Sequence, residues 1–242
     1  MPENERSPAA DRLIRPLLAR GELELVGRIQ WSSNATFLVS CSLGDDRCQA
    51  VYKPIRGERP LADFPVGLGR REVAAFELSE ALGWGLVPET VLREDAPFGP
   101  GSLQYFVDAD FSQHYFTMCS DPRSRAALQA IAAFDIVANN ADRKSGHCLA
   151  GPDGRIWAID NGLCFHAEPK LRTVIWDFAE DPIPPLLTEA LADVVSHLPD
   201  AVAQLLEPPE IEAVVQRGRR LLADGRFPLP SEDHPYYPWP LV

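Results

Sequence analysis

The hydrophobic pattern of the chain changes once, near Val107, and this change constrains the fold more than any other feature of the sequence. Before Val107, short runs in which apolar and polar residues alternate predict β-strands. Three strands are expected within residues 22–55 and two more at 86–92 and 101–107, with helices at 11–20 and 70–82. The first part of the chain is therefore expected to be rich in strands.

After Val107, helical spacing of the apolar residues prevails. Helices are expected at 123–139 and, as two or three segments, within 185–224, and a Gly-Pro-Asp-Gly turn predicts a hairpin that joins 148–150 to 156–159. The pattern as a whole predicts an α+β fold with two lobes. We expect a disordered tail at 1–10, a β-rich N-lobe at 11–107, a helical C-lobe at 108–230 and a proline-rich tail at 231–242.

Charge, hydropathy and cysteine usage narrow the possible classes of function. The 242 residues carry a formal net charge of −12, which disfavours binding to nucleic acids and to anionic membrane surfaces. A run of roughly 18 apolar residues, as a membrane span requires, is absent, so we expect no span. The first residues, MPENERSPAADR, are polar and unlike a signal peptide. Because the five cysteines include no CxxC pair, we expect a cytoplasmic protein with reduced thiols.

Two carboxylates stand where a phosphotransferase needs them. Asp142 lies in the polar loop NNADRKSGH between the long helix and the hairpin, where it can orient an acceptor hydroxyl and take its proton. Lys144, two residues later, can neutralise the phosphoryl group in transit. Asp160 ends the apolar strand IWAID and can hold Mg²⁺ on the phosphates of ATP. Taken alone, each aspartate also fits a structural role in a turn.

Lys53 and Glu72 could form an ion pair that positions the lysine for the phosphates of a nucleotide. Lys53 ends the third expected strand and can reach the α- and β-phosphates of ATP, and Glu72, early in the following helix, can pair with it. Taken alone, Lys53 is more often a solvated edge lysine and Glu72 an ordinary surface residue. The order of the parts supports the functional interpretation: strand lysine, helix glutamate, helix, loop aspartate, hairpin, and then Asp-x-Gly. This order predicts a protein-kinase-like fold.

The same segments resemble a known family. FDIVANNADRKSGHCL, followed by GRIWAIDNGLCF, resembles the catalytic and metal-binding loops of the phosphatidylinositol 3-/4-kinase superfamily. REVAAFELSEALGWGLVPETVL resembles the first-lobe helix and the next strand of the same superfamily. The likeness is greatest to type II phosphatidylinositol 4-kinases, HipA-type kinases and short bacterial phosphatidylinositol 3-/4-kinase-like proteins, and it covers about residues 22–180. It implies that Lys53 and Glu72 hold the phosphates, that Asp142 is catalytic, and that Asp160 binds the metal.

The resemblance also implies where the rest of the nucleotide binds. The hinge that meets adenine would be the strand at residues 103–107. The expected phosphate loop, residues 31–36, lacks a glycine-rich signature, so turn amides and hydroxyls would have to contact the phosphates. The residues expected to contact ATP in these two segments are Leu103, Tyr105, Val107, Ser33 and Asn34.

The metal site departs from the family pattern at one position. These kinases usually have an asparagine five residues after the catalytic aspartate, whereas this chain has His147. Imidazole suits Mn²⁺ better than Mg²⁺, and a structural role for this histidine is about equally compatible with the sequence. We expect Asp160, together with His147 or Asn140, to bind Mg²⁺ or Mn²⁺.

The sequence therefore predicts an ATP-dependent kinase whose acceptor is a protein, a small molecule or a phosphoinositide. Two other functions stay open: a non-catalytic, nucleotide-binding pseudokinase or scaffold, which the His147 departure motivates, and transfer of the nucleotidyl group from the same fold. Lys170 and Arg172 follow the Asp-Asn-Gly loop and are compatible with an acidic or phosphorylated acceptor, although a solvated loop is the commoner reason for such a pair. The expected ligands are ATP, Mg²⁺ or Mn²⁺ and an unidentified acceptor, because fold does not fix substrate.

Overall fold

The computed structural model describes residues 8–30, 34–231, 233 and 235–242. The chain forms two compact units, which are described in turn. Unit 1 comprises the chain up to Val73 together with Pro88–Asp108, and unit 2 comprises Ala74–Val87 together with Ala109–Val242. Helix α2 (Leu68–Ala81) begins in unit 1 and ends in unit 2.

Unit 1 is built on one antiparallel sheet of five strands in the order β1-β2-β3-β5-β4. The strands are β1 (Glu22–Arg28), β2 (Phe37–Leu43), β3 (Asp46–Pro54), β4 (Thr90–Arg93) and β5 (Gly101–Tyr105), and a short 3₁₀ turn, η1 (Ile55–Gly57), follows β3. Gly44, at φ 63°, opens the two-residue turn between β2 and β3, where the left-handed conformation favours glycine. The three strands predicted within residues 22–55 are therefore confirmed.

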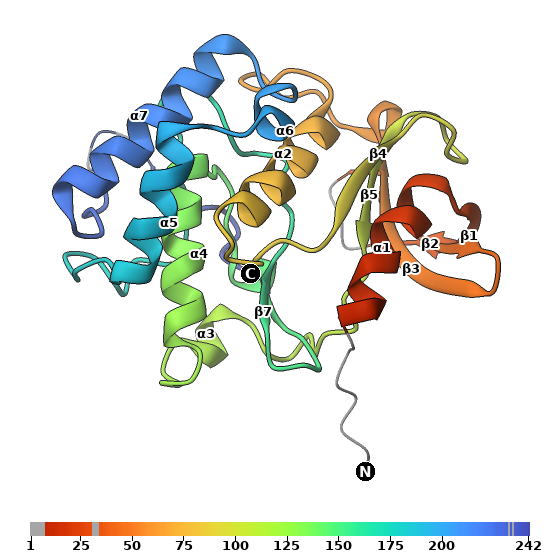
Figure 1. Cartoon of the computed structure of the whole chain (residues 1–242), viewed down its shortest axis with the longest axis horizontal. Helices are drawn as coiled ribbons and strands as arrows, with labels where there is room; N and C mark the ends of the chain where they lie inside the picture. Colours follow the sequence, from red (N-terminus) through yellow and green to blue (C-terminus); the bar gives the residue numbers. More distant parts are fainter. Residues whose placement is uncertain (1–7, 31–33, 232, 234) are drawn as a thin grey trace. The chain divides into compact units, whose positions relative to one another are not determined.

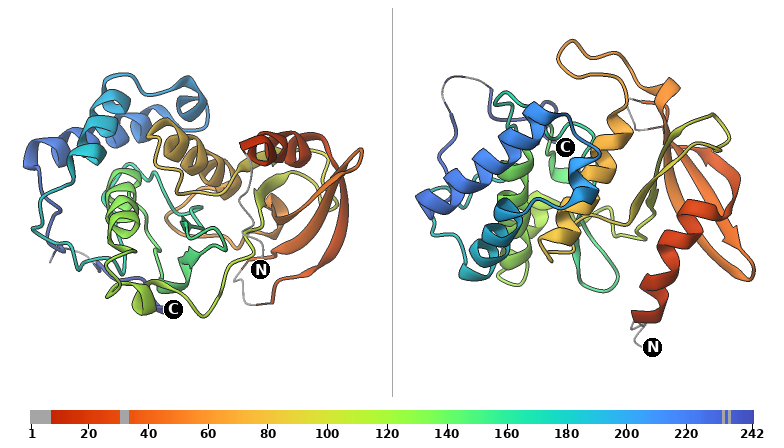
Figure 2. Two further views of the ribbon diagram at one scale, coloured as in Figure 1. Left: turned by 60° about the horizontal axis from the view of Figure 1, so that its bottom comes forward. Right: turned by 45° about the horizontal axis from the view of Figure 1, so that its top comes forward.

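Helix α1 (Pro8–Arg20) covers one face of this sheet (Figure 2). It begins at Pro8, earlier than predicted, so residues 8–10 are helical and do not belong to a disordered tail; proline is tolerated there because the first helical turn needs no N–H donor. Its end is capped by Arg93, whose Nη1 donates to the carbonyl oxygens of Leu18 and Gly21 at 2.9 and 3.1 Å. The core beneath the helix is made of Leu18, Val39, Cys41, Ala50, Tyr52, Val91 and Leu103.

Unit 2 is mainly helical. Besides the end of α2 it contains α3 (Tyr115–Met118), α4 (Arg125–Ala138), η2 (Ser145–His147), the hairpin β6 (Cys148–Ala150) and β7 (Ile156–Ala158), α5 (Pro185–Ser196), α6 (Asp200–Ala203) and α7 (Pro208–Asp224). Helices α4, α5 and α7 pack together (Figure 1), and most of α4 is buried. Gly218 lets α7 approach α5 closely, because a Cβ at this position would lie 2.4 Å from Cγ1 of Val195.

One predicted strand is shorter than expected. The segment predicted as a strand from residue 86 joins the sheet only at Thr90, where β4 begins. The backbone N–H groups of Leu86 and Val87 instead donate to Oγ of Ser79, at 2.8 and 3.2 Å. Pro88, which has no N–H, then interrupts any ladder. The side chain of a helix residue has therefore replaced the strand partner.

The proline-rich C-terminal segment has no helix among its described residues, as predicted, and packs against the rest of unit 2. The carbonyl oxygen of Tyr236 accepts hydrogen bonds from the N–H of Thr173 and from Nε1 of Trp176. The carbonyl oxygen of Leu241 accepts the N–H of Ser145 at 2.8 Å. The segment thus braces the loops that contain the candidate site.

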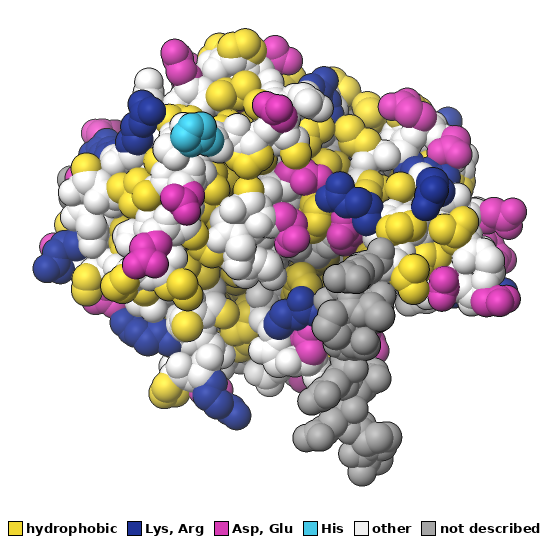
Figure 3. Space-filling view, in the orientation of Figure 1, with side chains coloured by type: hydrophobic (Ala, Val, Ile, Leu, Met, Phe, Trp, Pro, Cys, Tyr) yellow, Lys and Arg dark blue, Asp and Glu magenta, His cyan; other side chains and the backbone are white. Residues whose placement is uncertain are grey.

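Two further features concern the surface and the lengths of the helices. On the face of the molecule in Figure 3, acidic and basic side chains are interspersed with apolar ones. Of the helices in the part of the chain that the structure describes, none combines the length and the apolar run that crossing a bilayer requires.

Candidate functional site

In unit 2, the loop with Asp142 starts where helix α4 ends. Asn139 stops the helix in the left-handed conformation, at φ 55°, which asparagine adopts more readily than most residues. Its side-chain amide is buried and donates to the carbonyl oxygens of His166 and Glu168 at 2.8 and 2.7 Å. The chain is therefore turned out of the helix at a fixed position, directly before the predicted catalytic residues.

A buried guanidinium ties this loop to the loop of Asp160. Arg143 has no exposed side-chain surface, and its Nε and Nη2 donate to the Asp135 carboxylate on α4 at 2.9–3.1 Å. Nη1 donates to the carbonyl oxygen of Ile159 and Nη2 to Oδ1 of Asn161, both at 2.6 Å. Arg143, which directly follows Asp142, is thus hydrogen-bonded to the residues on either side of Asp160. We call Asp135, Arg143 and Asn161 the buried clamp.

In the buried clamp, the charges of Asp135 and Arg143 stabilise each other. Burial raises the pKa of the Asp135 carboxyl, and the charge and hydrogen bonds of Arg143 oppose that shift, as do hydrogen bonds from Asn140 and Thr173. Charges buried this completely are tolerated when they are paired and hydrogen-bonded. The buried clamp therefore holds the two loops in one arrangement but is sensitive to the loss of any member.

Asp142 itself is only partly covered. Its backbone N–H donates to Oδ1 of Asn140 at 2.9 Å, and its Oδ2 lies 3.1 Å from Nζ of Lys144. Burial raises the pKa of the Asp142 carboxyl, the positive charge of Lys144 lowers it, and the negative charge of Asp160 raises it. The net shift is upward, which suits a group that must accept a proton.

Asp160 follows strand β7 in a conformation that few residues other than glycine adopt. Its φ is 58°, and such backbone strain is found most often at functional sites. Asn161 secures the turn, because its Nδ2 donates to the carbonyl oxygen of Ala158 at 3.0 Å. The Asp160 side chain is 51% exposed, so its carboxylate is accessible to a ligand.

His147 contacts Asp160 through a defined ring nitrogen. The backbone N–H of Lys144 donates to Nδ1 of His147 at 3.3 Å, and Nε2 lies 3.4 Å from Oδ2 of Asp160. A neutral imidazole whose Nδ1 accepts a hydrogen bond has its proton on Nε2. In that tautomer Nε2 is a donor toward Asp160 and has no lone pair for a metal ion. This geometry favours His147 as the partner that orients Asp160.

The second candidate metal ligand, Asn140, is fully buried. Its Nδ2 donates to Asp135 at 3.1 Å and its Oδ1 accepts the Asp142 N–H, so both ends of the amide are already used. Among the described residues, no three His, Cys, Asp or Glu side chains are grouped as a metal site. Mg²⁺ is commonly held by one or two carboxylates together with phosphate oxygens and water, and the neighbouring carboxylates of Asp142 and Asp160 fit that pattern.

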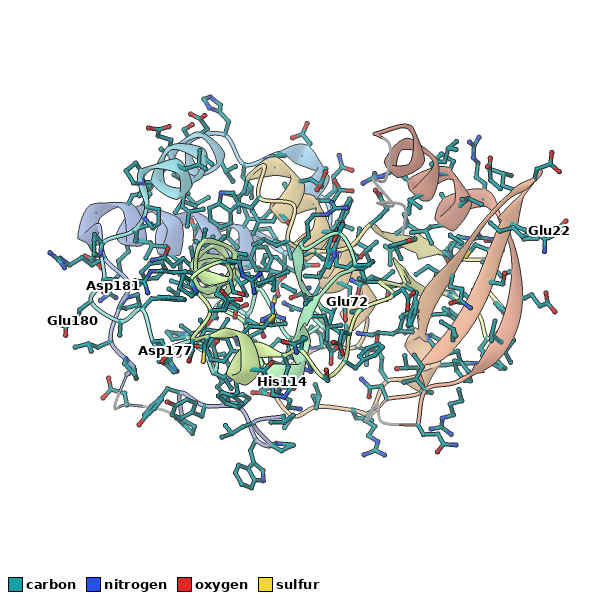
Figure 4. The ribbon with its side chains drawn as sticks, turned by 90° about the horizontal axis from the view of Figure 1, so that it is seen from below. Glu22, Glu72, His114, Asp177, Glu180 and Asp181 are labelled. Carbon is teal, nitrogen blue, oxygen red and sulfur yellow. The ribbon has the colours of Figure 1, made fainter. Side chains whose placement is uncertain are left out.

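In unit 1, the predicted ion pair between Lys53 and Glu72 is confirmed. Nζ of Lys53 lies 2.6 Å from Oε1 of Glu72, and the two side chains are 23% and 4% exposed. Glu72, which is labelled in Figure 4, is a buried residue of α2. Lys53 is opposite Ser102 of β5, and α2 approaches the same strand so closely that a Cβ on Gly69 would lie 3.3 Å from Cβ and N of Ser102. Lys53 therefore lies on the sheet face opposite the core under α1.

The predicted phosphate loop is described only in part. Ser33 lies outside the described residues. Oδ1 of Asn34 accepts the backbone N–H of Arg59 at 3.0 Å, and the N–H of Ala35 donates to the carbonyl oxygen of Gly57 at 3.0 Å. These bonds attach the end of the turn to the chain that follows β3.

The predicted hinge residues have different environments. The Leu103 side chain is fully buried in the core under α1, so it has no surface for a ligand. Tyr105 is half-buried at the end of β5, and its N–H donates to the carbonyl oxygen of Glu89 at 2.8 Å. Val107 is buried beyond the end of the strand. A hollow of about 430 Å³ in unit 1 is lined by residues 20–23, 93 and 95–97, none of which is a predicted site residue.

Sequence reasoning missed the buried clamp. Its only signal was Asp135, a charged residue among Leu128, Ile131 and Ala132 on a helix whose other residues are largely apolar. A charge at such a position is rarely buried without a partner, so it could have suggested one. A second contact, the hydrogen bond from the Tyr115 hydroxyl to the carboxylate of the exposed Asp177, left no sequence signal.

Comparisons with known proteins identify relatives of this chain. No family model matches it. Protein Rv2133c of Mycobacterium tuberculosis is 40% identical over 93% of this chain and 94% of its own length. Phosphatidylinositol 4-kinase gamma 4 of rice is 30% identical, but the match covers 63% of this chain and only 34% of the rice protein.

Two solved structures share the fold. A hydra Fam20 structure with sugar has a TM-score of 0.60 at 12% identity, covering 90% of this chain and 89% of that one. The proinflammatory kinase CtkA of Helicobacter pylori has a TM-score of 0.51 at 10% identity, covering 87% of this chain and 94% of that one. The predicted α+β, protein-kinase-like fold is confirmed.

Proposed function

Because the chain belongs to the family of the mycobacterial protein Rv2133c and has a kinase-like fold, we propose that it is an ATP-dependent phosphotransferase that transfers a phosphoryl group to a hydroxyl. One observation supports this most strongly. The Asp142 carboxylate, beside Lys144, belongs to a loop that a buried guanidinium ties to the strained, accessible Asp160. A plain turn would not need a buried ion pair to hold it against a second carboxylate.

The proposed roles in unit 2 follow from charge and exposure. Asp142 orients the acceptor hydroxyl and accepts its proton, and its raised pKa favours that role. Lys144 stabilises the charge on the phosphoryl group in transit. Asp160 holds Mg²⁺ or Mn²⁺, which would offset the charge of the ATP phosphates, while His147 orients the Asp160 carboxylate.

In unit 1, Lys53 is proposed to contact the phosphates of ATP. The nearly buried Glu72 carboxylate keeps the lysine ammonium in one position on the sheet face, so less side-chain entropy is lost when a phosphate binds. Asn34, Tyr105 and Val107 stay proposed contacts to the nucleotide. Because the side chain of Leu103 is buried, its proposed contact to the nucleotide is through its backbone.

Product analysis tests the function directly. The full chain would be incubated with ATP and Mg²⁺, and again with Mn²⁺, and protein and small molecules would be examined by mass spectrometry. Gain of a phosphoryl group supports the proposal, gain of an adenylyl group indicates nucleotidyl transfer, and unchanged ATP indicates a pseudokinase or scaffold. Asp160→Ala is expected to lose the thermal stabilisation that ATP with metal gives the wild type, and an unchanged shift in that variant contradicts the metal role.

The acceptor is proposed only as a hydroxyl compound. The name of the rice relative makes an inositol lipid one candidate, and a protein or a small molecule are the others. Phosphorylation of phosphatidylinositol vesicles, compared with phosphorylation of the protein itself, separates a lipid acceptor from a protein acceptor. We also propose a cytoplasmic location, on the basis of the odd number of cysteines and the lack of CxxC pairs.

A further inference from the structure

Two cysteines of unit 1 face each other across neighbouring strands. Cys41 of β2 is directly opposite Cys48 of β3 in the register of the antiparallel pair. Cys41 is fully buried in the core under α1, and Cys48 packs against the same core while remaining half-exposed. Both are free thiols, and neither has a part in the proposed phosphoryl transfer.

The sheet register places the Cα atoms of Cys41 and Cys48 within the range that disulfides join. Residues directly opposite each other in an antiparallel pair have Cα atoms about 4.5–5.5 Å apart, and disulfides join Cα atoms about 4.4–6.8 Å apart. Side chains of opposite residues lie on the same face of the sheet. The two thiols lie close enough for each to shift the pKa of the other. Closing a bond between them requires the two Cβ atoms, about 4.5–5.5 Å apart in such a pair, to approach to about 3.5–4.5 Å.

The two sulfurs are chemically unequal. Interaction with the Cys41 thiol lowers the pKa of Cys48, and the same interaction together with burial raises the pKa of Cys41. The thiolate is the nucleophilic form of cysteine. The half-exposed Cys48 is thus the thiol that a dissolved oxidant reaches first, and Cys41 is held against it as the resolving thiol. By contrast, Cys148 is opposite Ala158, and burial raises its pKa to about 12.

We propose that Cys41 and Cys48 form an oxidation site at which hydrogen peroxide closes an intramolecular disulfide. The Cys48 thiolate attacks one peroxide oxygen, the O–O bond breaks, and the second oxygen leaves as water after taking a proton. The Cys48 sulfenic acid that results is attacked by the Cys41 sulfur, so the S–S bond forms as the S–O bond breaks. The departing oxygen leaves as a second water with the Cys41 proton. Two thiols are oxidised, and the peroxide is reduced to two waters.

This site is separate from the proposed nucleotide contacts. Cys48 and Lys53 are both on β3 but five positions apart, so their side chains lie on opposite faces of the sheet. The disulfide would form on the α1 face, and the Lys53–Glu72 ion pair is on the other. The proposal therefore does not depend on phosphoryl transfer, and its test needs no ATP.

Peptide mapping tests the proposal, because Arg47 lies between the two cysteines. The reduced full chain would be treated with hydrogen peroxide, blocked with iodoacetamide and digested with trypsin without reductant. Cleavage after Arg28, Arg47 and Arg56 releases residues 29–47, which contain Cys41, and residues 48–56, which contain Cys48. We expect these two peptides joined, lighter by two hydrogen atoms than their sum, from protein that remains a monomer, and separated again by dithiothreitol.

Two variants sharpen the result. Cys48→Ser should abolish the joined peptide, whereas Cys119→Ser, which removes another half-buried free thiol that is outside every strand, should leave it unchanged. If the two peptides of the peroxide-treated wild type stay separate, with Cys41 and Cys48 alkylated or oxidised to sulfinic acid, the proposal is wrong. Joined peptides found only in covalent dimers would overturn it equally. Because the decisive measurement is made on the wild type, poor folding of a variant does not affect it.

Discussion

Replacing Arg143 by methionine should destabilise the protein far more than the loss of an ordinary arginine. The guanidinium is fully buried and donates to Asp135, Asn161 and the carbonyl oxygen of Ile159. Methionine keeps much of the side-chain volume but leaves the Asp135 carboxylate buried without a counter-charge. The cost is then the penalty of an uncompensated buried charge together with broken hydrogen bonds.

The expected size of this effect follows from the burial. Removing one partner of a buried ion pair typically costs about 3–5 kcal/mol, out of a total stability of about 5–15 kcal/mol for a folded protein. For a chain of this length each kcal/mol lowers the melting temperature by about 2–4 °C, so Arg143→Met should melt roughly 6–20 °C lower. Arg220 provides the matched control. It is 86% exposed and pairs with Asp224 at 3.7 Å, so Arg220→Met should change stability by less than about 1 kcal/mol.

Urea unfolding, followed by circular dichroism, measures these differences. The double variant Asp135→Leu with Arg143→Met should recover part of the loss, because it removes both charges together. A cost below about 1 kcal/mol for Arg143→Met, no greater than that of the surface control, would refute the reasoning that a buried charge pair holds the two loops together.

Three further variants test other parts of the structure. Lys53→Met should weaken ATP binding by calorimetry with the circular dichroism spectrum unchanged, and Lys170→Met, which removes a lysine outside the proposed nucleotide contacts, should not. Asp142→Asn should melt higher than the wild type at neutral pH, because the raised pKa of the folded state means that folding favours the protonated, uncharged carboxyl. The difference in melting temperature should vanish as the pH falls below about 3.9, where the wild-type carboxyl is also protonated, and a difference that persists at every pH would contradict this reasoning. Gly218→Ala should cost about 1–3 kcal/mol of unfolding free energy, because its Cβ meets Val195 at 2.4 Å, and an unaffected urea midpoint would show that α5 and α7 can separate freely.

Much of the fold was predictable because local pattern and tertiary environment agree. In strands β2 and β3 buried residues alternate with more exposed ones, because one face of these strands is buried under α1. The Lys53–Glu72 pair was predictable from the order of the elements alone. By contrast, β4 begins only at Thr90, because the hydroxyl of Ser79 takes backbone N–H groups that the pattern assigned to a strand.

The features that could not be predicted depend on contacts between distant segments. The buried clamp joins Asp135, Arg143 and Asn161, and nothing in local periodicity shows that these three side chains meet. The C-terminal segment was correctly expected to be non-helical. Its proline content did not reveal that the carbonyl oxygens of Tyr236 and Leu241 would brace the loops around the candidate site.

The most direct test of the central claim compares ATP turnover by the wild type and by Asp142→Asn, with Mg²⁺ and again with Mn²⁺. Removing one well-placed charged group from such a site typically costs about 3–4 kcal/mol, or a rate loss on the order of 100- to 1000-fold. Asp142→Asn should therefore bind ATP with nearly wild-type affinity and lose almost all turnover, including any phosphorylation of the protein itself. Equal rates of ATP consumption by the two proteins, with both metals, would show that Asp142 is a structural loop residue and would contradict the proposed phosphotransferase.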